Sequence, residues 1–209
     1  MRSFWISIVK SQVWMSACAS FALFGTAMPV RASAQEQRRE AHQPLALGFN
    51  IDLFPTVISA VNGKLGYAPQ IWFGVDHFRA RLVVAHLEPP DALAFADKGF
   101  RHPTTTAFAG ILDYTFGPHF DRWWIGAGFE LWRQTIEHDS VAGNAAWTSV
   151  VLTVGGGYIW RFSGNFFIDP WIAAHGTLNP QTVTLGSFSY QPFPLIADVS
   201  IKVGWFMDL

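Results

Sequence analysis

The most constraining feature of this sequence is a two-residue alternation that runs through residues 106–134 on both sides of a turn. Before the turn, the even positions are all apolar or glycine: Phe108, Gly110, Leu112, Tyr114 and Phe116. After the breaker at residues 117–121, the odd positions are apolar: Trp123, Ile125, Ala127, Phe129 and Leu131. Because side chains alternate faces along a strand, this pattern predicts a hairpin of two strands. Each strand has about ten residues, the length that a tilted strand needs to cross a bilayer.

The same alternation recurs along the rest of the chain and predicts eight strands in all. The predicted strands are residues 45–54, 70–75, 78–87, 106–116, 123–134, 146–162, 166–177 and 195–206. Long loops alternate with tight turns, and the long loops are predicted at residues 55–68, 88–105, 137–145 and 178–194. Outer-membrane barrels have this asymmetry, with short periplasmic turns and long external loops. The sequence therefore predicts an all-β fold, an eight-stranded antiparallel up-and-down transmembrane β-barrel over residues 45–209.

The first 34 residues are predicted to be a cleaved signal peptide. Arg2 and Lys10 stand there without an acid, an apolar stretch follows, and residues 32–34 form an Ala-Ser-Ala cleavage site. A retained membrane helix and a lipoprotein signal at Cys18 are the alternatives. Residues 35–44 are polar and charged, and we expect them to form an exposed leader before the barrel domain.

Composition narrows the classes of protein to which the chain can belong. All fifteen Asp and Glu residues follow residue 34, but only eleven of the fourteen Lys and Arg residues do, so the mature chain has a formal charge of −4. No basic patch indicates nucleic-acid binding. The only cysteine is Cys18, so we expect no disulfide or thiol chemistry in the mature chain. No cofactor is expected, and a monomer is the simplest state.

The distribution of charge favours a membrane barrel over a soluble one. In each predicted strand the ionisable residues share a face with glycine, serine and threonine, and the opposite face is almost free of charge. A soluble barrel would have to pack the large apolar side chains into its narrow interior.

Aromatic residues gather on the apolar face near the tight turns. They are predicted to form a girdle at the membrane–water interface, and a stacked layer in a soluble sandwich is the alternative. The residues are Phe78, Tyr114, Phe116, Trp123, Tyr158, Trp160, Phe166 and Trp205.

These features together resemble the small outer-membrane barrels of Gram-negative bacteria, of the OmpA, OmpX and OmpW type. The resemblance covers residues 45–209 and rests on the leader, the eight amphipathic strands, the girdle and the aromatic-rich last strand. Family members usually finish on an aromatic residue, whereas this sequence finishes Met207-Asp208-Leu209. The resemblance implies a location in the outer membrane, with outer-membrane lipid as a partner.

Nine ionisable residues are predicted to point into the barrel interior. Charges in a narrow interior must pair, because an isolated buried charge is costly. We interpret the set as an ionic network that closes the lumen, and a selective or gated pore is the alternative. The residues are Asp52, Arg79, Arg81, Asp113, Glu130, Asp169, His175, Asp198 and Lys202. Five of them are predicted to lie toward the end with the tight turns: Arg79, Arg81, Asp113, Asp169 and Lys202.

The weak candidates for catalysis are His175 and Thr177. They lie in a His-Gly-Thr segment that loosely resembles the His-x-Ser motif of outer-membrane lipid A deacylases, with threonine in place of serine. Both side chains are predicted to face inward, like Ser149, and the histidine is interpreted as part of the polar network. The glycine run at residues 155–157 has no helix signal after it and is interpreted as a bend in the sheet. The seven histidines show no metal-binding spacing, so no metal site is expected.

The function predicted from these patterns is a structural or interaction role for an outer-membrane barrel that presents external loops. The loops at residues 88–105 and 178–194 are the expected surface for an extracellular or envelope partner, because loops on a rigid scaffold commonly carry binding. Two alternatives remain open. One is a lipid-modifying enzyme of the lipid A deacylase type, and the other is a narrow pore for small or apolar solutes.

Overall fold

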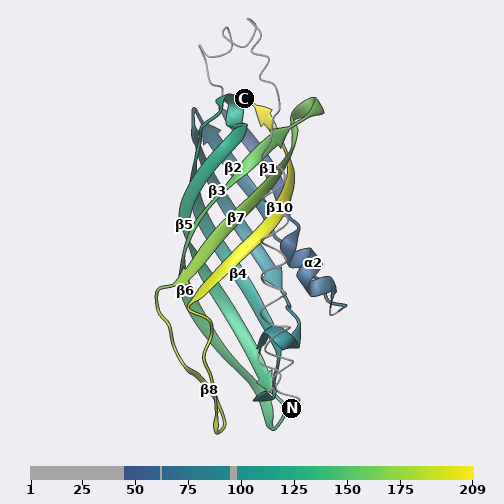
Figure 1. Ribbon diagram of the computed structural model, residues 1–209, viewed down its shortest axis with the longest axis vertical. Helices are drawn as coiled ribbons and strands as arrows, with labels where there is room; N and C mark the ends of the chain where they lie inside the picture. Colours follow the sequence, from purple (N-terminus) through teal and green to yellow (C-terminus); the bar gives the residue numbers. More distant parts are fainter. Residues whose placement is uncertain (1–44, 62, 95–97) are drawn as a thin grey trace, which may run out of the picture. The chain divides into compact units, whose positions relative to one another are not determined.

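The structure is a computed structural model that describes residues 45–61, 63–94 and 98–209. The predicted signal peptide and leader, residues 1–44, lie outside the described residues. Eight strands of the described chain close into one barrel (Figure 1). They are β1 (Ala46–Asp52), β2 (Pro69–Val75), β3 (Phe78–Leu87), β4 (Phe100–Thr115), β5 (Arg122–His138), β6 (Val141–Arg161), β7 (Phe166–Thr177) and β10 (Leu195–Asp208).

The strands pair in the ring order β1-β10-β7-β6-β5-β4-β3-β2, and every pair is antiparallel. Barrel strands that follow one another in the chain are therefore neighbours, and the pairing of β1 with β10 closes the ring. This confirms the predicted all-β, eight-stranded, up-and-down barrel. The connections contain α2 (Phe54–Ala60), the hairpin of β8 (Val183–Leu185) and β9 (Phe188–Tyr190), and the short 3-10 helices η1 (Asp91–Ala94), η3 (Pro118–Phe120) and η4 (Ser163–Asn165).

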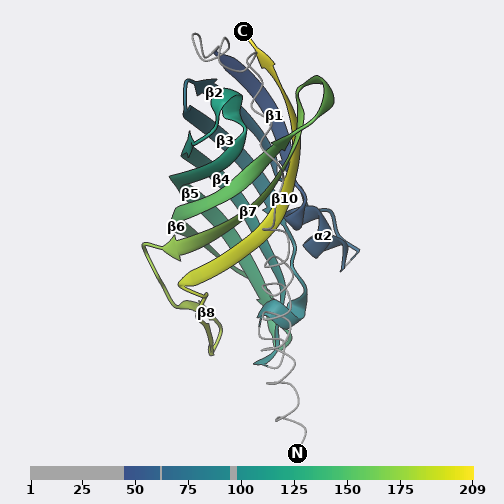
Figure 2. The ribbon, with the colours of Figure 1, turned by 45° about the horizontal axis from the view of Figure 1, so that its top comes forward.

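The register of the strands fixes how steeply they tilt. The series of paired residues that starts at Leu195 on β10 runs through all the other strands and returns to β10 at Trp205, ten residues further on. Such an offset on eight strands corresponds to a tilt of roughly 40°, and Figure 2 shows the strands crossing the barrel obliquely. A barrel of this size has an interior that side chains can fill.

Side chains alternate between the interior and the outer surface along the strands. On β5, Trp124 and Glu130 are buried, whereas Trp123, Ile125 and Phe129 are exposed. The other strands repeat this arrangement over most of their length, so the outer surface of the wall is mainly apolar and most charged residues of the wall are inside. The period of two in the sequence therefore sets which side chains meet in the interior.

Two segments that the sequence predicted as loops are partly strand. β5 and β6 continue through most of residues 137–145 and are joined by a two-residue turn at positions 139 and 140. β4 begins at Phe100, inside the predicted loop at residues 88–105. The prediction was wrong here because the strands extend beyond the apolar alternation. Their main chains still pair, as Thr104 and Thr135 do across β4 and β5.

The remaining long connections contain short elements that the sequence analysis missed. α2 lies in the predicted loop at residues 55–68, and the hairpin β8–β9 lies in the one at residues 178–194. No helix among the described residues is long and apolar enough to cross a bilayer. The glycine run at residues 155–157 continues as strand within β6. A Cβ on Gly155 would lie 2.7 Å from the carbonyl oxygen of Ile172, so the first glycine of the run permits close approach to β7.

Candidate functional site: the barrel interior

Aromatic side chains close the interior at the end that carries the tight turns. Trp72 packs against both Phe120 and Phe206, and the ring centroids are 5.4 Å apart in each pair. Phe167 extends the cluster, with its ring centroid 6.1 Å from that of Phe206. We call this cluster the aromatic plug; its buried members are Ala46, Trp72, Phe120, Trp124, Ile159, Phe167 and Phe206.

Glycines on the neighbouring strands make room for the rings of the plug. A Cβ added to Gly48 would lie 2.1 Å from Cε2 of Trp72, and one added to Gly74 would lie 2.3 Å from Cζ of Phe120. Contacts this short are far inside van der Waals distance, so only glycine fits there without displacing a ring. Large and small residues on adjacent strands thus fill the narrow interior together.

Phe120 enters the plug from a strained turn between β4 and β5. His119, Phe120 and Arg122 have φ angles of 52°, 56° and 68°, in the left-handed region. This conformation costs an L-residue about 1–2 kcal/mol. Burial of a phenylalanine side chain stabilises by about 1.5–3 kcal/mol, which offsets part of that cost. The sequence identified this segment only as a strand breaker, because the alternation says nothing about where a turn residue points.

A layer of ion pairs lies beside the plug. The carboxylate of Asp113 accepts hydrogen bonds from Arg79 Nε at 2.8 Å, and from Arg81 Nε at 2.6 Å and Nη2 at 2.9 Å. Arg81 Nη1 donates to Gln70 Oε1 at 2.9 Å. The three charged side chains are buried, so pairing offsets the cost of removing them from water. Arg79 and Asp113 meet because they are cross-strand partners on β3 and β4.

Asp169 connects this layer to a buried lysine. Its Oδ1 accepts a hydrogen bond from Trp124 Nε1 at 2.8 Å, and its Oδ2 lies 3.8 Å from both Arg79 Nη2 and Lys202 Nζ. Lys202 Nζ also lies 3.7 Å from the ring centroid of Trp171, a cation–π arrangement. We call this set, with three cations and two carboxylates, the cationic layer: Arg79, Arg81, Asp113, Asp169 and Lys202.

A second charged group lies farther from the plug and is mainly acidic. Glu130 accepts hydrogen bonds from Thr153 Oγ1 and, at 2.6 Å, from Trp132 Nε1. His175 Nδ1 lies 3.2 Å from Glu130 Oε1, and His175 Nε2 lies 3.9 Å from Asp198 Oδ2. At the next inward position of β10, Ser200 donates a hydrogen bond to Asp52. We call this set the acidic layer: Asp52, Glu130, His175 and Asp198.

The residues predicted to form one lumen network therefore occupy two layers of different charge. All nine lie inside the barrel, and cross-strand register decides which of them meet. The sequence analysis did not single out Gln70, Thr153 or Ser200, which complete the two layers through hydrogen bonds. Their only signal in the sequence is that they share the inward parity of the charged residues on their strands.

The weak catalytic candidates lie on the inner side of β7. His175 and Thr177 are odd-numbered residues of β7, whereas the exposed Ile172 is even-numbered, so the two candidates belong to the other face of the strand. His175 Nδ1 lies 2.9 Å from Thr153 Oγ1, within the acidic layer. Ser149 is also internal and donates to Gln134 Oε1 at 3.0 Å. The side chains of His175 and Ser149 are therefore engaged in the interior of the barrel.

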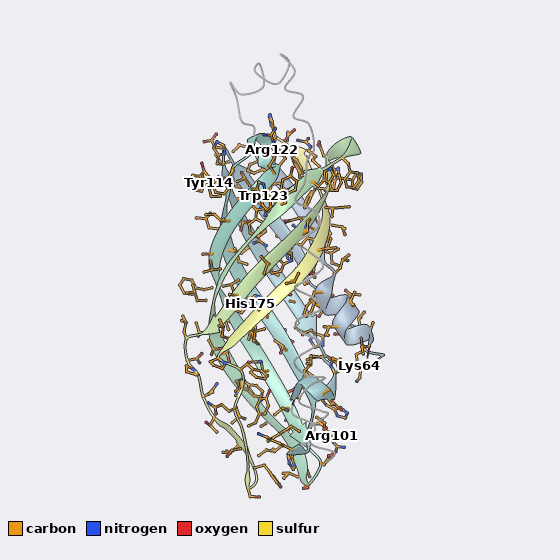
Figure 3. The ribbon with its side chains drawn as sticks, in the orientation of Figure 1. Lys64, Arg101, Tyr114, Arg122, Trp123 and His175 are labelled. Carbon is orange, nitrogen blue, oxygen red and sulfur yellow. The ribbon has the colours of Figure 1, made fainter. Side chains whose placement is uncertain are left out.

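The residues predicted to form the girdle lie on the outer side of the wall near the tight turns. Figure 3 shows Tyr114 and Trp123 at this end of the barrel. Neighbouring strands bring their rings together, with centroids 5.5 Å apart for Phe78 and Tyr114 and 5.0 Å apart for Trp123 and Tyr158. Trp205 Nε1 donates to the carbonyl oxygen of Gly164 at 3.1 Å. The remaining members, also exposed, are Phe116, Trp160 and Phe166.

A second apolar cluster lies at the opposite end, beyond the closed ring, on the extended parts of β4, β5 and β6. The hairpin β8–β9 packs against the extended parts of β4, β5 and β6, where the ring centroid of Phe100 lies 5.1 Å from that of Tyr190. His138 stacks on Phe188 at 3.7 Å. Burial raises the pKa of Tyr190 above its usual value of 10.0. We call this cluster the external cap; its buried members are Ala94, Phe100, Ile136, Ala145, Val183, Leu185 and Tyr190.

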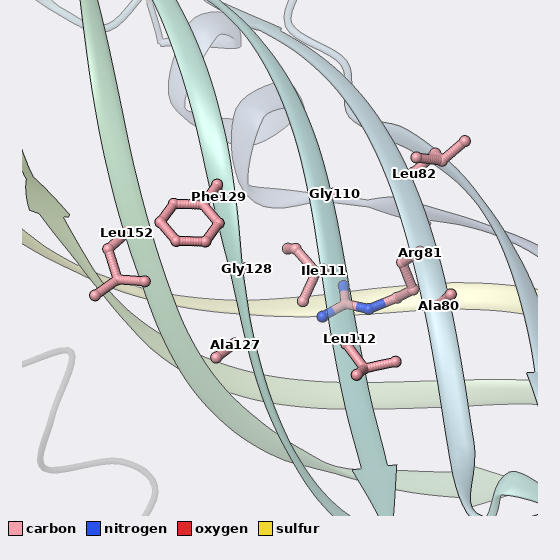
Figure 4. A pocket seen from close by; sticks show the side chains of 10 residues that line it. All are labelled: Ala80, Arg81, Leu82, Gly110, Ile111, Leu112, Ala127, Gly128, Phe129 and Leu152. Carbon is pink, nitrogen blue, oxygen red and sulfur yellow. The ribbon is translucent and has the colours of Figure 1, made fainter.

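A pocket of about 470 Å³ lies on the outer side of the wall (Figure 4). Gly110 lines the pocket, and a Cβ added to this glycine would meet no atom within 4 Å. The exposed side chains of Leu82, Leu112 and Phe129 surround the glycine. The pocket is therefore a dent in the apolar outer surface.

Among the described residues, no group of three or more His, Cys, Asp or Glu side chains is arranged to hold a metal ion. No protein-family model matches the sequence, and no curated protein matches it.

Three solved structures with a related architecture are outer-membrane or surface proteins. The N-terminal β-barrel domain of OprF from Pseudomonas aeruginosa is 12% identical, with 79% of this chain and 98% of that chain covered and a TM-score of 0.48. Neisserial surface protein A is 12% identical, with coverage of 79% and 95% and a TM-score of 0.44. A major outer membrane protein from Thermus thermophilus is 8% identical, with coverage of 79% and 100% and a TM-score of 0.49.

Proposed function

We propose that this protein is an outer-membrane β-barrel with a closed lumen that holds an ordered external surface in place. Its role is structural or interactive, through an extracellular or envelope partner, and it is a monomer. One observation carries the proposal: an apolar cluster and two charged layers fill the barrel interior, and a second apolar cluster beyond the closed ring packs the hairpin β8–β9 on the extended strands. A barrel with a filled interior is rigid and can hold the external surface in place.

The outer surface supports a location in a membrane. On β5 the outward residues are apolar from Trp123 to Leu131, and Arg133 is the first charged one. About nine residues of tilted strand match an apolar band roughly 25 Å tall. The cross-strand partners of Arg133 are Thr106 and Thr148, so the change to polar residues occurs on three neighbouring strands at paired positions. A soluble barrel would present polar side chains along the whole wall.

The external end supports an interaction role because its charged groups lie on extended strands. Arg101 Nη1 lies 2.8 Å from Asp139 Oδ1, and His102 Nδ1 lies 3.0 Å from Glu137 Oε2. Figure 3 shows Arg101 at the opposite end of the barrel from Tyr114. The external cap holds these strands together from within, and sites held on rigid elements are commonly used for binding.

The two alternatives have less support from the interior. A pore would need a continuous water path, but the aromatic plug fills one end of the interior and the two charged layers lie next to it. A deacylase would need its histidine open to lipid, but His175 lies in the acidic layer.

The first test is expression of the full chain in a Gram-negative host, followed by gels of the outer-membrane fraction with and without heating. We expect a band whose migration changes on heating, no conductance in planar bilayers, and unchanged lipid A. A soluble periplasmic protein without a heat shift would overturn the membrane location. Conductance altered by Arg81→Ala would favour the pore, and lipid modification lost with His175→Ala would favour the enzyme.

The interaction role has a separate test. Cells that produce the protein are compared with cells that produce a variant in which residues 181–191 are replaced by a glycine-serine linker. We expect the variant to insert normally but to lose the contribution of the protein to adhesion or to detergent resistance. Gly110→Ala, on the opposite side of the wall from the interior, is the matched control. If the linker variant and the full chain behave alike in both assays, the external surface has no such role.

A further inference from the structure

α2 covers a gap between two strands of the barrel wall. The pairing of β1 with β10 ends at Asp52 and Lys202, so the first residues of β10 have no β1 partner. The pairing of β2 with β3 ends at Gln70 and Val83, and beyond it β3 is joined on this side only by an isolated bridge between His86 and Tyr67. α2 packs against both β3 and β10. Figures 1 and 2 both show it on the outer side of the barrel, beside β10.

Hydrogen bonds hold the α2 segment firmly against the wall. The main-chain N–H of Phe54 donates to Asp52 Oδ1 at 3.0 Å and to Ser200 Oγ at 3.1 Å. At the other end, the main-chain N–H of Glu88 on the β3 side donates to Ser59 Oγ at 2.9 Å. The orientation of α2 is therefore set by polar contacts, and the face that it turns outward is fixed.

The polarity of α2 is inverted relative to a helix that packs on a protein in water. Its buried residues are Pro55 and Ser59. Apart from Thr56, its outward side chains are apolar, and so are those of Val61 and Leu65 just beyond its end; the exposed fractions are 64% for Val57, 71% for Val61 and 72% for Leu65. A surface helix in water turns its apolar face toward the protein. The opposite arrangement is stable when the surroundings are apolar.

We infer that α2 and Leu65 form an interfacial anchor that inserts into the external leaflet of the outer membrane. This inference rests on the proposed function, since it requires the barrel to lie in a bilayer. Apolar side chains on such a segment enter the boundary between headgroups and acyl chains, and their burial there stabilises the bound state. Val57, Val61 and Leu65 supply the apolar contact.

The position of α2 along the wall matches this boundary. The outward residues of β3 are apolar from Phe78 to Val84, and His86 is the first polar one. Lys64 Nζ lies 3.2 Å from Glu88 Oε2, next to the end of this apolar run. A half-exposed ammonium group at this level is placed to meet the anionic phosphates of lipid headgroups, while the nearby apolar side chains reach toward the acyl chains.

A lipid surface explains the exposed side chains better than a protein partner does. The outward face of α2 lies beside the apolar surface of the flanking strands, where Val84 on β3 and Leu195 on β10 are also exposed. A second copy of the chain that covered α2 would still leave much of this surrounding surface exposed. One bilayer covers the helix and the strands together.

The test measures the depth of single spin labels in the full chain, reconstituted in phosphatidylglycerol–phosphatidylcholine vesicles. Cys18 is the only cysteine, so a Cys18→Ser background permits one label at a time. Labels are placed by Val57→Cys and Val61→Cys on the anchor. Two positions are the controls: Leu82→Cys on the apolar wall and Ala142→Cys near the start of β6, beside the turn that joins it to β5. Collision with oxygen, which concentrates in hydrocarbon, is compared with collision with a water-soluble nickel chelate.

We expect the oxygen-to-nickel collision ratio at positions 57 and 61 to be several-fold higher than at position 142 and close to that at position 82. A high ratio at position 82 with water-like ratios at 57 and 61 would overturn the anchor and leave the membrane barrel standing. Water-like ratios at all four positions would overturn the proposed function itself. Labels at 57 and 61 that are immobilised and shielded from both reagents would indicate a protein partner, which also overturns the lipid anchor.

Discussion

The aromatic plug and the external cap lie at opposite ends of one barrel, but their supports differ. The plug lies within the closed ring, where every strand is paired on both sides. The cap depends on the hairpin β8–β9, which forms a separate two-stranded sheet and is held to the barrel strands by side-chain packing. To open the plug, the ring itself would have to break. To open the cap, only the packing of one hairpin must be lost.

This difference predicts that the aromatic plug is the more stable of the two clusters and that the external cap opens more readily. Ring closure leaves no unpaired edge, so local opening near the plug costs many hydrogen bonds at once. Elements with fewer cooperative contacts open at lower free energy. We therefore expect variants near the plug to change the stability of the whole barrel, and variants in the cap to act mainly on the hairpin.

The largest expected effect follows from Asp113→Asn. This change removes the carboxylate that pairs with both Arg79 and Arg81 and leaves two buried guanidinium groups poorly compensated. The free energy of unfolding should fall by about 3–5 kcal/mol, measured by urea unfolding in lipid vesicles. Asp139→Asn is the control, because the carboxylate of Asp139 is exposed and its pair with Arg101 contributes at most about 1 kcal/mol. Equal losses in both variants would contradict the role of the cationic layer.

The next effect concerns the cap. Ile136→Ala removes a fully buried side chain and should lower the free energy for opening the cap by about 2–5 kcal/mol. Proteinase K should then cut residues 178–194 faster, while the heat-dependent gel shift of the barrel stays as in the parent chain. Thr184→Ala on the exposed face of β8 serves as the control. Loss of the gel shift together with faster cutting would mean that cap and barrel unfold as one unit.

A smaller effect is expected from Gly48→Ala in the plug. The added methyl group would overlap the ring of Trp72, and such overpacking costs about 1–3 kcal/mol. Urea unfolding is again the measurement. Gly110→Ala adds the same methyl group where nothing lies within 4 Å, and it should leave the stability nearly unchanged. If the two variants lose the same stability, steric fit around the plug is not the cause.

The smallest effect is a pH dependence of the cap. Burial raises the pKa of Tyr190, so the folded cap holds the phenolic proton more tightly than the unfolded chain does. Its contribution to stability is complete below the usual value of 10.0 and is lost as the pH rises through the higher folded value. Proteolysis of residues 178–194 should therefore increase at alkaline pH, and Tyr190→Phe should reduce this increase. Tyr67→Phe, at an exposed tyrosine, should leave it unchanged.

The sequence was sufficient for the features that depend on local periodicity. Alternation located the eight strands and separated an apolar face from a face with charges, because neighbouring side chains on a strand must point to opposite sides. It failed where pairing continues without that pattern, as in the extensions of β5 and β6 through residues 137–145. It also passed over α2, whose outward apolar residues fall in a segment rich in turn signals.

The sequence by itself determined which residues face the interior, but only the tertiary structure decided which of them meet. Asp113 pairs with Arg79 and Arg81, and Glu130 contacts His175, because the register of a closed ring sets neighbouring strands at fixed offsets. No local pattern carries those offsets. The same closure brings the ring of Phe120 from a turn onto Trp72. The sequence also placed the residues of the cationic layer toward the end with the tight turns, but the register decides which of them pair. Parity is a property of one strand, whereas register is a property of the whole ring.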